Sequence, residues 1–295
     1  MNSTLMPSRL VFGTGGRFGR LQPTLAQFLV DQAWSHGIRT FDTGYHYSSG
    51  ASQRLLCSCL SKYLLDESLQ ISTKVKADPY NMIHSIDRTY SMFGGRPLDV
   101  VFLWGPSIEQ LHDKDTIALM QAYLQSGVVT CFGVNTHDLL VMDSILSSPC
   151  SAFLSDVMVD YSLARLESSV FISQFSSSGL RVWAGTALGQ GYLIESIFNQ
   201  FLRTRSLSYL LRAFLSPATR ELVAKAAPIR RALHTAYPTL CADLPLSFVL
   251  SNPNVNYIPV GMMASSSIKR NIFIESSLCK NEAPLKHLIE LFDAG

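Results

Sequence analysis

Three polar residues follow apolar segments of the chain and could together move a proton. Asp42 ends the apolar run 38–41, Tyr47 follows five residues later, and Lys74 lies near the end of a second apolar run, 69–75. Proteins with parallel strands place their chemistry at the carboxyl ends of those strands. An ammonium group near a phenol lowers the phenol's pKa from about 10, and a carboxylate keeps that ammonium charged. Such a phenol can act as general acid to a carbonyl oxygen during hydride delivery.

Each of the three residues also has a structural explanation that the spacing does not exclude. Asp42 could cap a turn after its strand, Tyr47 could be a packed aromatic residue, and Lys74 could be a solvated surface residue. The proton-transfer hypothesis therefore depends on whether the fold brings the three side chains together.

An alternating series of strands and helices must position these residues. Continuous apolar runs predict eight strands, at 10–12, 38–41, 69–75, 98–104, 128–134, 153–159, 180–184 and 255–260. Apolar residues at helical spacing predict helices between them, at 23–37, 52–64, 83–93, 117–125, 139–146 and 170–176, and in much of 194–248. Apolar strands between helices indicate a parallel sheet covered on its outer face. The pattern predicts an α/β fold, a (β/α)₈ TIM barrel in one domain (1–295), with extra helices and a loop over the barrel mouth before the last strand.

The composition excludes several classes of function. A net charge of +2 gives no electrostatic footprint for nucleic acid. No apolar run approaches the roughly 20 residues of a membrane span, and the first residues lack the basic and apolar regions of a signal peptide. The six cysteines show neither disulfide nor zinc spacing, and the seven histidines show no metal-ligand spacing. We therefore expect a cytoplasmic protein without a metal site, acting on a small molecule and not on nucleic acid or membrane.

Several stretches resemble the aldo-keto reductases. Residues 37–48, GIRTFDTGYHYS, are similar to the first signature of that family, and further similar stretches follow in order at 72–75, 98–106, 127–135, 179–193 and 256–261. Within the family, the pattern is closest to the branch that contains sugar and pyridoxal dehydrogenases. The resemblance implies a (β/α)₈ barrel that binds a nicotinamide nucleotide without a Rossmann domain, in agreement with the strand count.

The resemblance also implies catalytic roles. Tyr47 would be the acid/base, Lys74 the neighbour that lowers its pKa, and Asp42 the partner of Lys74. The fourth residue of the family's tetrad is usually a histidine, but Trp104 stands there, and an indole N–H donates one hydrogen bond without shuttling protons. This departure puts conventional carbonyl reduction in doubt. His46 could substitute for the missing histidine, although a loop histidine is more often solvated.

The implied cofactor is NADP or NAD. Near the nicotinamide we expect Gly13, Thr14 and Gly15 after the first strand, with Asp42. Asn135 and Thr136 stand where the family has Ser-Asn, Met158 stands where it has Gln, and Gly185 stands where it often has a stacking aromatic. The resemblance places further contacts along the pyrophosphate and in the turn and helix after the last strand: Thr186, Leu188, Gln190, Gly261, Ser267, Arg270 and Asn271. The arginine expected for a 2′-phosphate is absent from its usual position.

The glycines at 13–19 also invite a Rossmann interpretation. A Rossmann turn needs its last glycine to open a helix directly, whereas the helical pattern here begins only near Pro23. The sequence therefore favours the barrel, in which residues 13–15 form the first strand-end loop.

Three functional hypotheses remain open. The leading one is an oxidoreductase of aldo-keto reductase type that moves hydride between NAD(P)H and a small carbonyl, alcohol or sugar-like substrate. A second keeps the proton-transfer set but catalyses a non-redox elimination, isomerisation or cyclisation in a biosynthetic pathway. The third is a catalytically drifted barrel that serves as a binding or regulatory subunit. The oligomeric state is not readable from the sequence.

Overall fold

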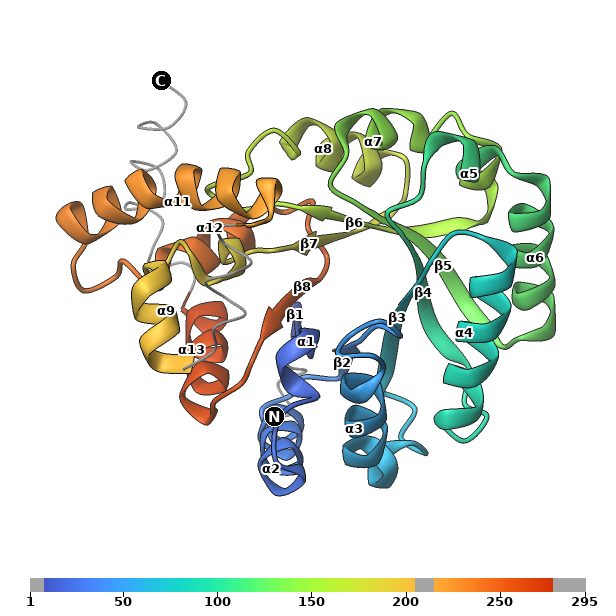
Figure 1. Cartoon of the computed structure of the whole chain (residues 1–295), viewed down its shortest axis with the longest axis horizontal. Helices are drawn as coiled ribbons and strands as arrows, with labels where there is room; N and C mark the ends of the chain where they lie inside the picture. The colour runs from blue at the N-terminus through green and yellow to red at the C-terminus, as the bar shows by residue number, and fades with distance from the viewer. Residues whose placement is uncertain (1–7, 205–214, 278–295) are drawn as a thin grey trace, which may run out of the picture.

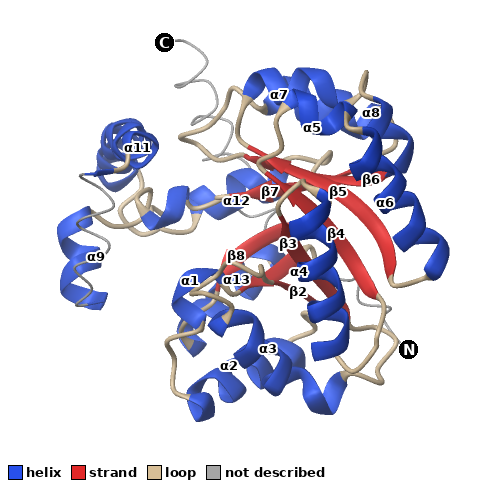
Figure 2. Cartoon of the chain, turned by 45° about the vertical axis from the view of Figure 1, so that its right-hand side comes forward, coloured by secondary structure: helices blue, strands red, loops and turns tan. Residues whose placement is uncertain are grey.

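Eight parallel strands form the centre of the molecule (Figure 2). The computed structural model describes residues 8–204 and 215–277. The strands are β1 (Leu10–Gly13), β2 (Thr40–Asp42), β3 (Gln70–Val75), β4 (Leu98–Trp104), β5 (Val129–Thr136), β6 (Leu154–Asp160), β7 (Arg181–Gly185) and β8 (Ile258–Gly261). Their order in the sheet is β7-β6-β5-β4-β3-β2-β1-β8. All the carboxyl ends therefore lie at one end of the barrel, the mouth.

The sheet is closed between β7 and β8 by a short seam. Trp183 of β7 and Tyr257, which precedes β8, form an isolated parallel bridge. The N–H of Ala184 donates to the Tyr257 carbonyl at 2.8 Å, and the Trp183 and Tyr257 rings stack with centroids 4.4 Å apart. The expected (β/α)₈ barrel is confirmed, with a seam between its last two strands that is narrower than its other pairings.

Helices surround the strands (Figure 1). They are α1 (Gly15–Phe18), α2 (Pro23–Ser35), α3 (Ala51–Leu60), α4 (Pro79–Met92), α5 (Ile108–His112), α6 (Lys114–Ser126), α7 (Leu139–Ile145), α8 (Ser169–Ser177), α9 (Ile197–Thr204), α11 (Pro217–Ala236), α12 (Leu244–Ser251) and α13 (Ser265–Ser276). Short 3₁₀ turns are η1 (Ser61–Tyr63), η2 (Pro149–Phe153) and η3 (Gly189–Gly191). Figures 1 and 2 show α9 and α11 at the side of the barrel, with the largely buried α12 between them and the strands.

The predicted strands match the observed ones, but several helix boundaries differ. The segment between the predicted strand 98–104 and the predicted helix 117–125 contains α5, which Ser107 begins with a reciprocal capping box. The helix expected from residue 83 begins at Pro79, because the Asp78 carboxylate accepts from the Asn81 N–H and proline is favoured in the first turn. A one-turn helix, α1, begins at Gly15, so the expectation that no helix starts before Pro23 was wrong. The helical region before β8 is confirmed as α9, α11 and α12, and part of the predicted loop over the mouth lies outside the described residues.

The barrel interior is filled by its own apolar cluster. The cluster comprises Val11, Val100, Phe102, Met158 and Trp183, and the rings of Phe102 and Trp183 meet edge to face at 5.2 Å. A much larger cluster fills the space between the strands and the surrounding helices. The filled interior makes the barrel a packed core, so ligands must bind at its mouth.

Gly133 of β5 shows how tightly this interior is packed. A β-carbon at Gly133 would lie 2.7 Å from the Phe102 ring and 2.9 Å from the Asp156 carbonyl, and the β5–β6 register shifts at this point. We expect Gly133→Ala to lower the free energy of unfolding by about 1–3 kcal/mol, because backbone and a buried ring must both move. Chemical denaturation measures this effect. Gly16→Ala, whose β-carbon would meet its nearest atom at 3.7 Å, is the matched control. Equal denaturation midpoints for the two variants would contradict the prediction.

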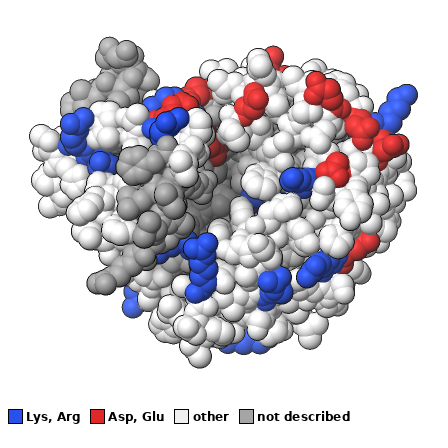
Figure 3. All heavy atoms as spheres, viewed as in Figure 1, with Lys and Arg blue, Asp and Glu red and all other residues white. Residues whose placement is uncertain are grey.

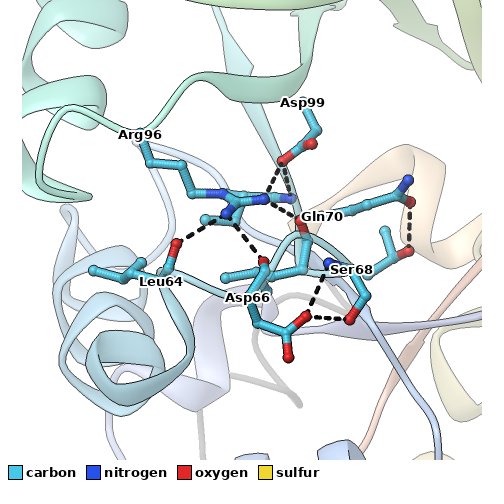
Figure 4. A network of polar contacts seen from close by, with 9 residues as sticks. Leu64, Asp66, Ser68, Gln70, Arg96 and Asp99 are labelled. Carbon is cyan, nitrogen blue, oxygen red and sulfur yellow. Dashed lines mark hydrogen bonds and ion pairs between the residues drawn. The ribbon is translucent and has the colours of Figure 1, made fainter.

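The guanidinium of Arg96 joins β3 and β4 at the ends that lie opposite the mouth (Figure 4). Arg96 donates from Nη1 to the carbonyls of Leu64 (2.9 Å) and Asp66 (3.2 Å), and from Nη2 to the carbonyl of Leu69. The same group lies 3.9 Å from Asp99, whose carboxylate accepts from the Ile71 N–H at 2.8 Å. These contacts lock the start of β3 against β4, and β3 carries Lys74 at its other end.

Charged side chains are scattered over the surface. On the face drawn in Figure 3, acidic side chains lie mostly at the upper right, and basic side chains are spread over the rest. The described residues on this face form no continuous basic stripe, and the expectation that nucleic acid is not a partner stays a prediction. Among the described residues, no helix is both long and apolar enough to cross a membrane.

Candidate active site

The structure brings Asp42, Lys74 and Tyr47 together at the mouth. Lys74 Nζ donates to both carboxylate oxygens of Asp42 at 2.6 Å, and both side chains are only 5% exposed. The Ser72 hydroxyl donates to the same carboxylate at 2.8 Å. Lys74 Nζ also lies 5.4 Å from the centre of the Tyr47 ring. Three residues from two strand ends and the loop after β2 therefore form one contiguous set.

The loop after β2 aims Tyr47 at Lys74 by a series of tight turns. The Tyr47 N–H donates to the Gly44 carbonyl at 3.0 Å, and a β-carbon at Gly44 would lie 3.4 Å from the Tyr47 ring. Ser48 and Ser49 hold positive φ angles of 49° and 52°, a conformation that costs non-glycine residues about 1–3 kcal/mol each. The Ser48 hydroxyl donates to the Gly16 carbonyl of α1, which helps hold this strained loop in place.

Burial changes the expected protonation of Tyr47. Burial raises the pKa of Tyr47 above its ordinary value of 10, and the Asp42 charge raises it further, while Lys74 opposes both. The predicted net lowering of this pKa was therefore wrong, because loss of solvent outweighs the ammonium. For Lys74, burial lowers the pKa, but Asp42 and Tyr47 raise it overall. At neutral pH the site holds a protonated phenol beside a charged ammonium.

Trp104 and His46 lie side by side at the mouth. Trp104 is the last residue of β4, opposite Asn135 of β5, and its side chain is 41% exposed. The His46 ring centre lies 5.7 Å from that of Trp104. The Nε2 atom of His46 is buried and has no hydrogen-bond partner in the described part of the chain. The expectation of a solvated loop histidine was therefore wrong for this nitrogen.

The residues after β1 are engaged with the backbone of β2. Gly13 pairs with Asp42 in the sheet, and a β-carbon there would lie 3.3 Å from the Val260 carbonyl. The N–H and the hydroxyl of buried Thr14 both reach the Asp42 carbonyl, at 3.0 and 3.1 Å. The Gly15 carbonyl accepts from the Ser52 hydroxyl at 2.7 Å. Gly13 and Thr14 therefore fix the position of Asp42, whereas Gly15 bonds to α3 and opens α1 instead of continuing a loop.

The residues of interest on β5 and β6 are two polar residues, Asn135 and Thr136, and one apolar residue, Met158. Asn135 is half-buried, and its Nδ2 donates to the Met158 carbonyl at 3.3 Å. The Met158 side chain is 3% exposed and belongs to the apolar cluster inside the barrel. Met158 therefore forms part of the floor beneath the mouth and offers no strong polar contact. Thr136 is buried, and its hydroxyl accepts from the Asp138 N–H at 3.1 Å.

Asp160 at the end of β6 is a site residue that the sequence reasoning missed. Asp160 pairs with Gly185 of β7, and a β-carbon at Gly185 would lie 3.4 Å from the Asp160 Oδ1. Burial raises the pKa of Asp160, with His137 and Thr186 opposing. The signal that could have found it is the one that identified Asp42, a carboxylate at the end of an apolar strand.

The loop after β7 winds through positive φ angles. Thr186 and Gln190 have φ of 52° and 55°, and Gly189 and Gly191 also lie in this region. Gln190 is exposed at the surface, whereas Leu188 packs against the large apolar cluster. The predicted contacts Thr186, Leu188 and Gln190 therefore face three different environments.

The predicted contacts after β8 also differ in their exposure and in their partners. Gly261 is exposed, and a β-carbon there would meet no atom within 4 Å. The Ser267 N–H donates to the Ala264 carbonyl at the start of α13, a helix without a side-chain cap. Arg270 Nε donates to the Asp243 carboxylate at 2.6 Å, and Asn271 is buried. Asp243 therefore competes with a phosphate for Arg270, and the phosphate contact of Arg270 stays a prediction.

Comparisons with known proteins place these features in context. The model of the Aldo/keto reductase family matches residues 9–282. An aldo/keto reductase from Klebsiella pneumoniae, solved with NADP and acetate, is 17% identical with a TM-score of 0.72, over 96% of this chain and 91% of that one. The holo form of an aldo-keto reductase from Bacillus halodurans is 17% identical with a TM-score of 0.68, over 95% of this chain and 93% of that one. A search of the curated proteins found no match. At this identity the solved structures show a common fold.

Proposed function

Because this chain belongs to the aldo/keto reductase family, we propose that it is an NAD(P)-dependent oxidoreductase that acts on a small carbonyl, alcohol or sugar-like substrate. The observation that carries the proposal is the Asp42–Lys74–Tyr47 set, in which the buried Lys74 ammonium is bonded to Asp42 and lies 5.4 Å from the centre of the Tyr47 ring. We also propose that residues 1–295 form one domain, since the family match spans nearly the whole chain. The described cysteines are free, which supports a cytoplasmic location.

The residues at the mouth fit a nicotinamide nucleotide. Asn135 offers an amide to the carboxamide of the nicotinamide, and Gly185 leaves the end of β7 without a side chain that would occupy the mouth. At the other end, open space at Gly261 lies just before the N-terminus of α13, where backbone N–H groups favour a phosphate. The bound pyrophosphate would follow the glycine-rich loop after β7. Because Asp243 holds Arg270, we propose either NADP or NAD and no strong preference for a 2′-phosphate.

The residues of this chain perform the proton half of the reaction. When bound, the reduced nicotinamide supplies the hydride to the carbonyl carbon. Tyr47 donates its hydroxyl proton to the carbonyl oxygen as the C=O π bond breaks, so hydride and proton together give the alcohol. Lys74 stabilises the phenolate that remains, and Asp42 holds Lys74 in place at 2.6 Å. Oxidation of an alcohol is the reverse and needs Tyr47 deprotonated.

The pH dependence follows from the direction of the Tyr47 pKa. A raised pKa extends the range in which the phenol carries its proton, so the rate of carbonyl reduction should stay level through neutral pH and decline only above about 10. The rate of alcohol oxidation should rise with pH over the same range. Single-turnover rates across pH in both directions measure this. A decline of reduction with an apparent pKa near 7 would contradict it.

Cofactor binding gives the direct test of the proposed function. Titration of the protein with NADPH and with NADH, followed by cofactor fluorescence, should show saturable binding of at least one. Mixing with 4-nitrobenzaldehyde or glyceraldehyde should then oxidise the bound cofactor. Absence of binding by either nucleotide at millimolar concentration would exclude the proposal.

Trp104 favours a second candidate function. An indole cannot accept a hydrogen bond or shuttle a proton, so the Tyr47 set could instead serve a non-redox elimination, isomerisation or cyclisation. This candidate predicts substrate turnover without any net change in nicotinamide absorbance. It fails if Tyr47→Phe leaves that turnover intact.

A further inference from the structure

The imidazole of His46 carries a polar atom that the fold leaves without a partner. Its Nε2 is enclosed by protein and makes no hydrogen bond to any described residue. Buried ring nitrogens ordinarily have a partner, and one that lacks it in a native structure needs an explanation. His46 directly precedes Tyr47, the proposed proton donor, so the orphan nitrogen lies in the same loop as the reacting phenol.

Aromatic rings hold the imidazole in place. The Tyr45 ring meets it edge to face, with centroids 5.3 Å apart, and the Trp104 ring lies at 5.7 Å. The Tyr45 hydroxyl is itself fixed by His84 Nε2 at 3.1 Å. The strained turn around Ser48 fixes the backbone of the same loop. The two ring contacts restrict the orientation of the His46 imidazole, although His46 lies in a loop.

The environment of His46 suits a neutral hydrogen-bond donor. Burial lowers the pKa of His46, and the nearby charge of Lys76 lowers it further. The imidazole is then uncharged at neutral pH and carries one N–H. An uncharged donor can hold a carbonyl oxygen without competing with Tyr47 for the proton transfer.

Trp104 also lies beside His46, but its indole is less suited to holding a carbonyl oxygen. Its indole carries a single donor and is 41% exposed at the end of β4. For a substrate to reach the buried His46 Nε2, the exposed indole would have to rotate outward. Its packing against His46 thus covers and orients the imidazole.

We infer that His46, adjacent to Tyr47 and packed against Trp104, is the residue that orients the substrate carbonyl in this protein. Nε2–H donates a hydrogen bond to the carbonyl oxygen, Tyr47 then donates the proton to the same oxygen, and His46 neither gains nor loses a proton. The substrate is accordingly an aldehyde or ketone whose oxygen lies between the imidazole and the phenol. This inference rests on the proposed reductase function.

His46→Phe provides the first test, because phenylalanine keeps a ring between Tyr45 and Trp104 but removes the donor. With NADPH and 4-nitrobenzaldehyde, we expect kcat to fall by about 100-fold, in the range for loss of one donor to a developing charge. NADPH affinity and the melting temperature should change little. His36→Ala, at the C-terminal end of α2, is the matched control and should keep wild-type kcat. A His46→Phe kcat within twofold of wild type would overturn the inference, as would loss of NADPH binding in parallel with kcat.

Two further variants separate orientation from packing. His46→Gln retains an N–H donor and should keep more kcat than His46→Phe. The double variant His46→Phe/Trp104→His returns an imidazole to the end of β4 and should recover at least tenfold of the lost kcat. No recovery in either variant would mean that His46 acts only through packing. If wild-type protein fails to oxidise NADPH or NADH with any aldehyde, the proposed function itself fails, whereas an active wild type with an active His46→Phe variant refutes the inference alone.

Discussion

Tyr47→Phe is expected to lower the rate of carbonyl reduction by about 10³-fold while leaving nucleotide affinity unchanged. The substitution removes one hydroxyl and keeps the ring beside Lys74, so the site loses its proton donor and little of its packing. General acid catalysis typically contributes 10²–10⁴-fold, and Tyr47 is the group of the set that is protonated and uncharged. Single-turnover oxidation of bound NADPH by 4-nitrobenzaldehyde measures the effect.

Tyr63→Phe is the matched control for this experiment. The Tyr63 hydroxyl donates to Asp31 at 2.8 Å in a contact between η1 and α2, away from the mouth. Its loss should cost about 1 kcal/mol of stability and leave the rate unaffected. If Tyr47→Phe keeps more than a tenth of the wild-type rate, the phenol is not the proton donor, and the mechanism proposed above is incorrect.

Lys74→Met should be the most destabilising single change at the site. It leaves the Asp42 carboxylate, 5% exposed, with only the Ser72 hydroxyl as a side-chain partner. Breaking a buried ion pair by removing one partner costs about 3–5 kcal/mol, because the other charge stays buried. Denaturant unfolding measures the loss, and activity should disappear with it.

The double variant Asp42→Asn/Lys74→Met distinguishes stability from chemistry. With both charges removed, the penalty of an isolated buried charge disappears, so most of the unfolding free energy should return. Reductase activity should stay absent, since nothing then stabilises the Tyr47 phenolate. A double variant as unstable as Lys74→Met would show that packing around the methionine, and not the stranded carboxylate, causes the loss.

Much of the fold and the centre of the site could be predicted because both depend on local patterns. Apolar runs mark the strands, and in a parallel barrel every strand end lies at the same mouth, so Asp42 and Lys74 were certain to be near each other once the fold was known. Tyr47 follows from the short length of the loop after β2. The same reasoning applied to β6 identifies Asp160 as a carboxylate at a strand end. The family resemblance instead indicated Met158, two residues earlier, as the contact on this strand.

Other properties could not be read from the sequence because they depend on tertiary neighbours. The net pKa shift of Tyr47 is set by how much water the fold excludes, which no motif encodes. Arg270 is held by Asp243, a residue just before α12 that comes beside α13 only in the folded chain. The orphan nitrogen of His46 likewise depends on Trp104, which lies 58 positions further along the sequence.

The short seam makes the β7–β8 side of the mouth the part of the barrel with the fewest backbone contacts between neighbouring strands. Only the region around Trp183 and Tyr257 joins these two strands, and the proposed nucleotide contacts Gly185 and Gly261 lie beyond it at the free edges. Asp42 of β2 and Lys74 of β3, by contrast, lie on strands that pair with neighbours on both sides, away from that edge. A nucleotide that contacts both Gly185 and Gly261 would hold the ends of β7 and β8 together. We therefore expect amide hydrogen exchange in β7 and β8 to slow on nucleotide binding, while that of β3 hardly changes.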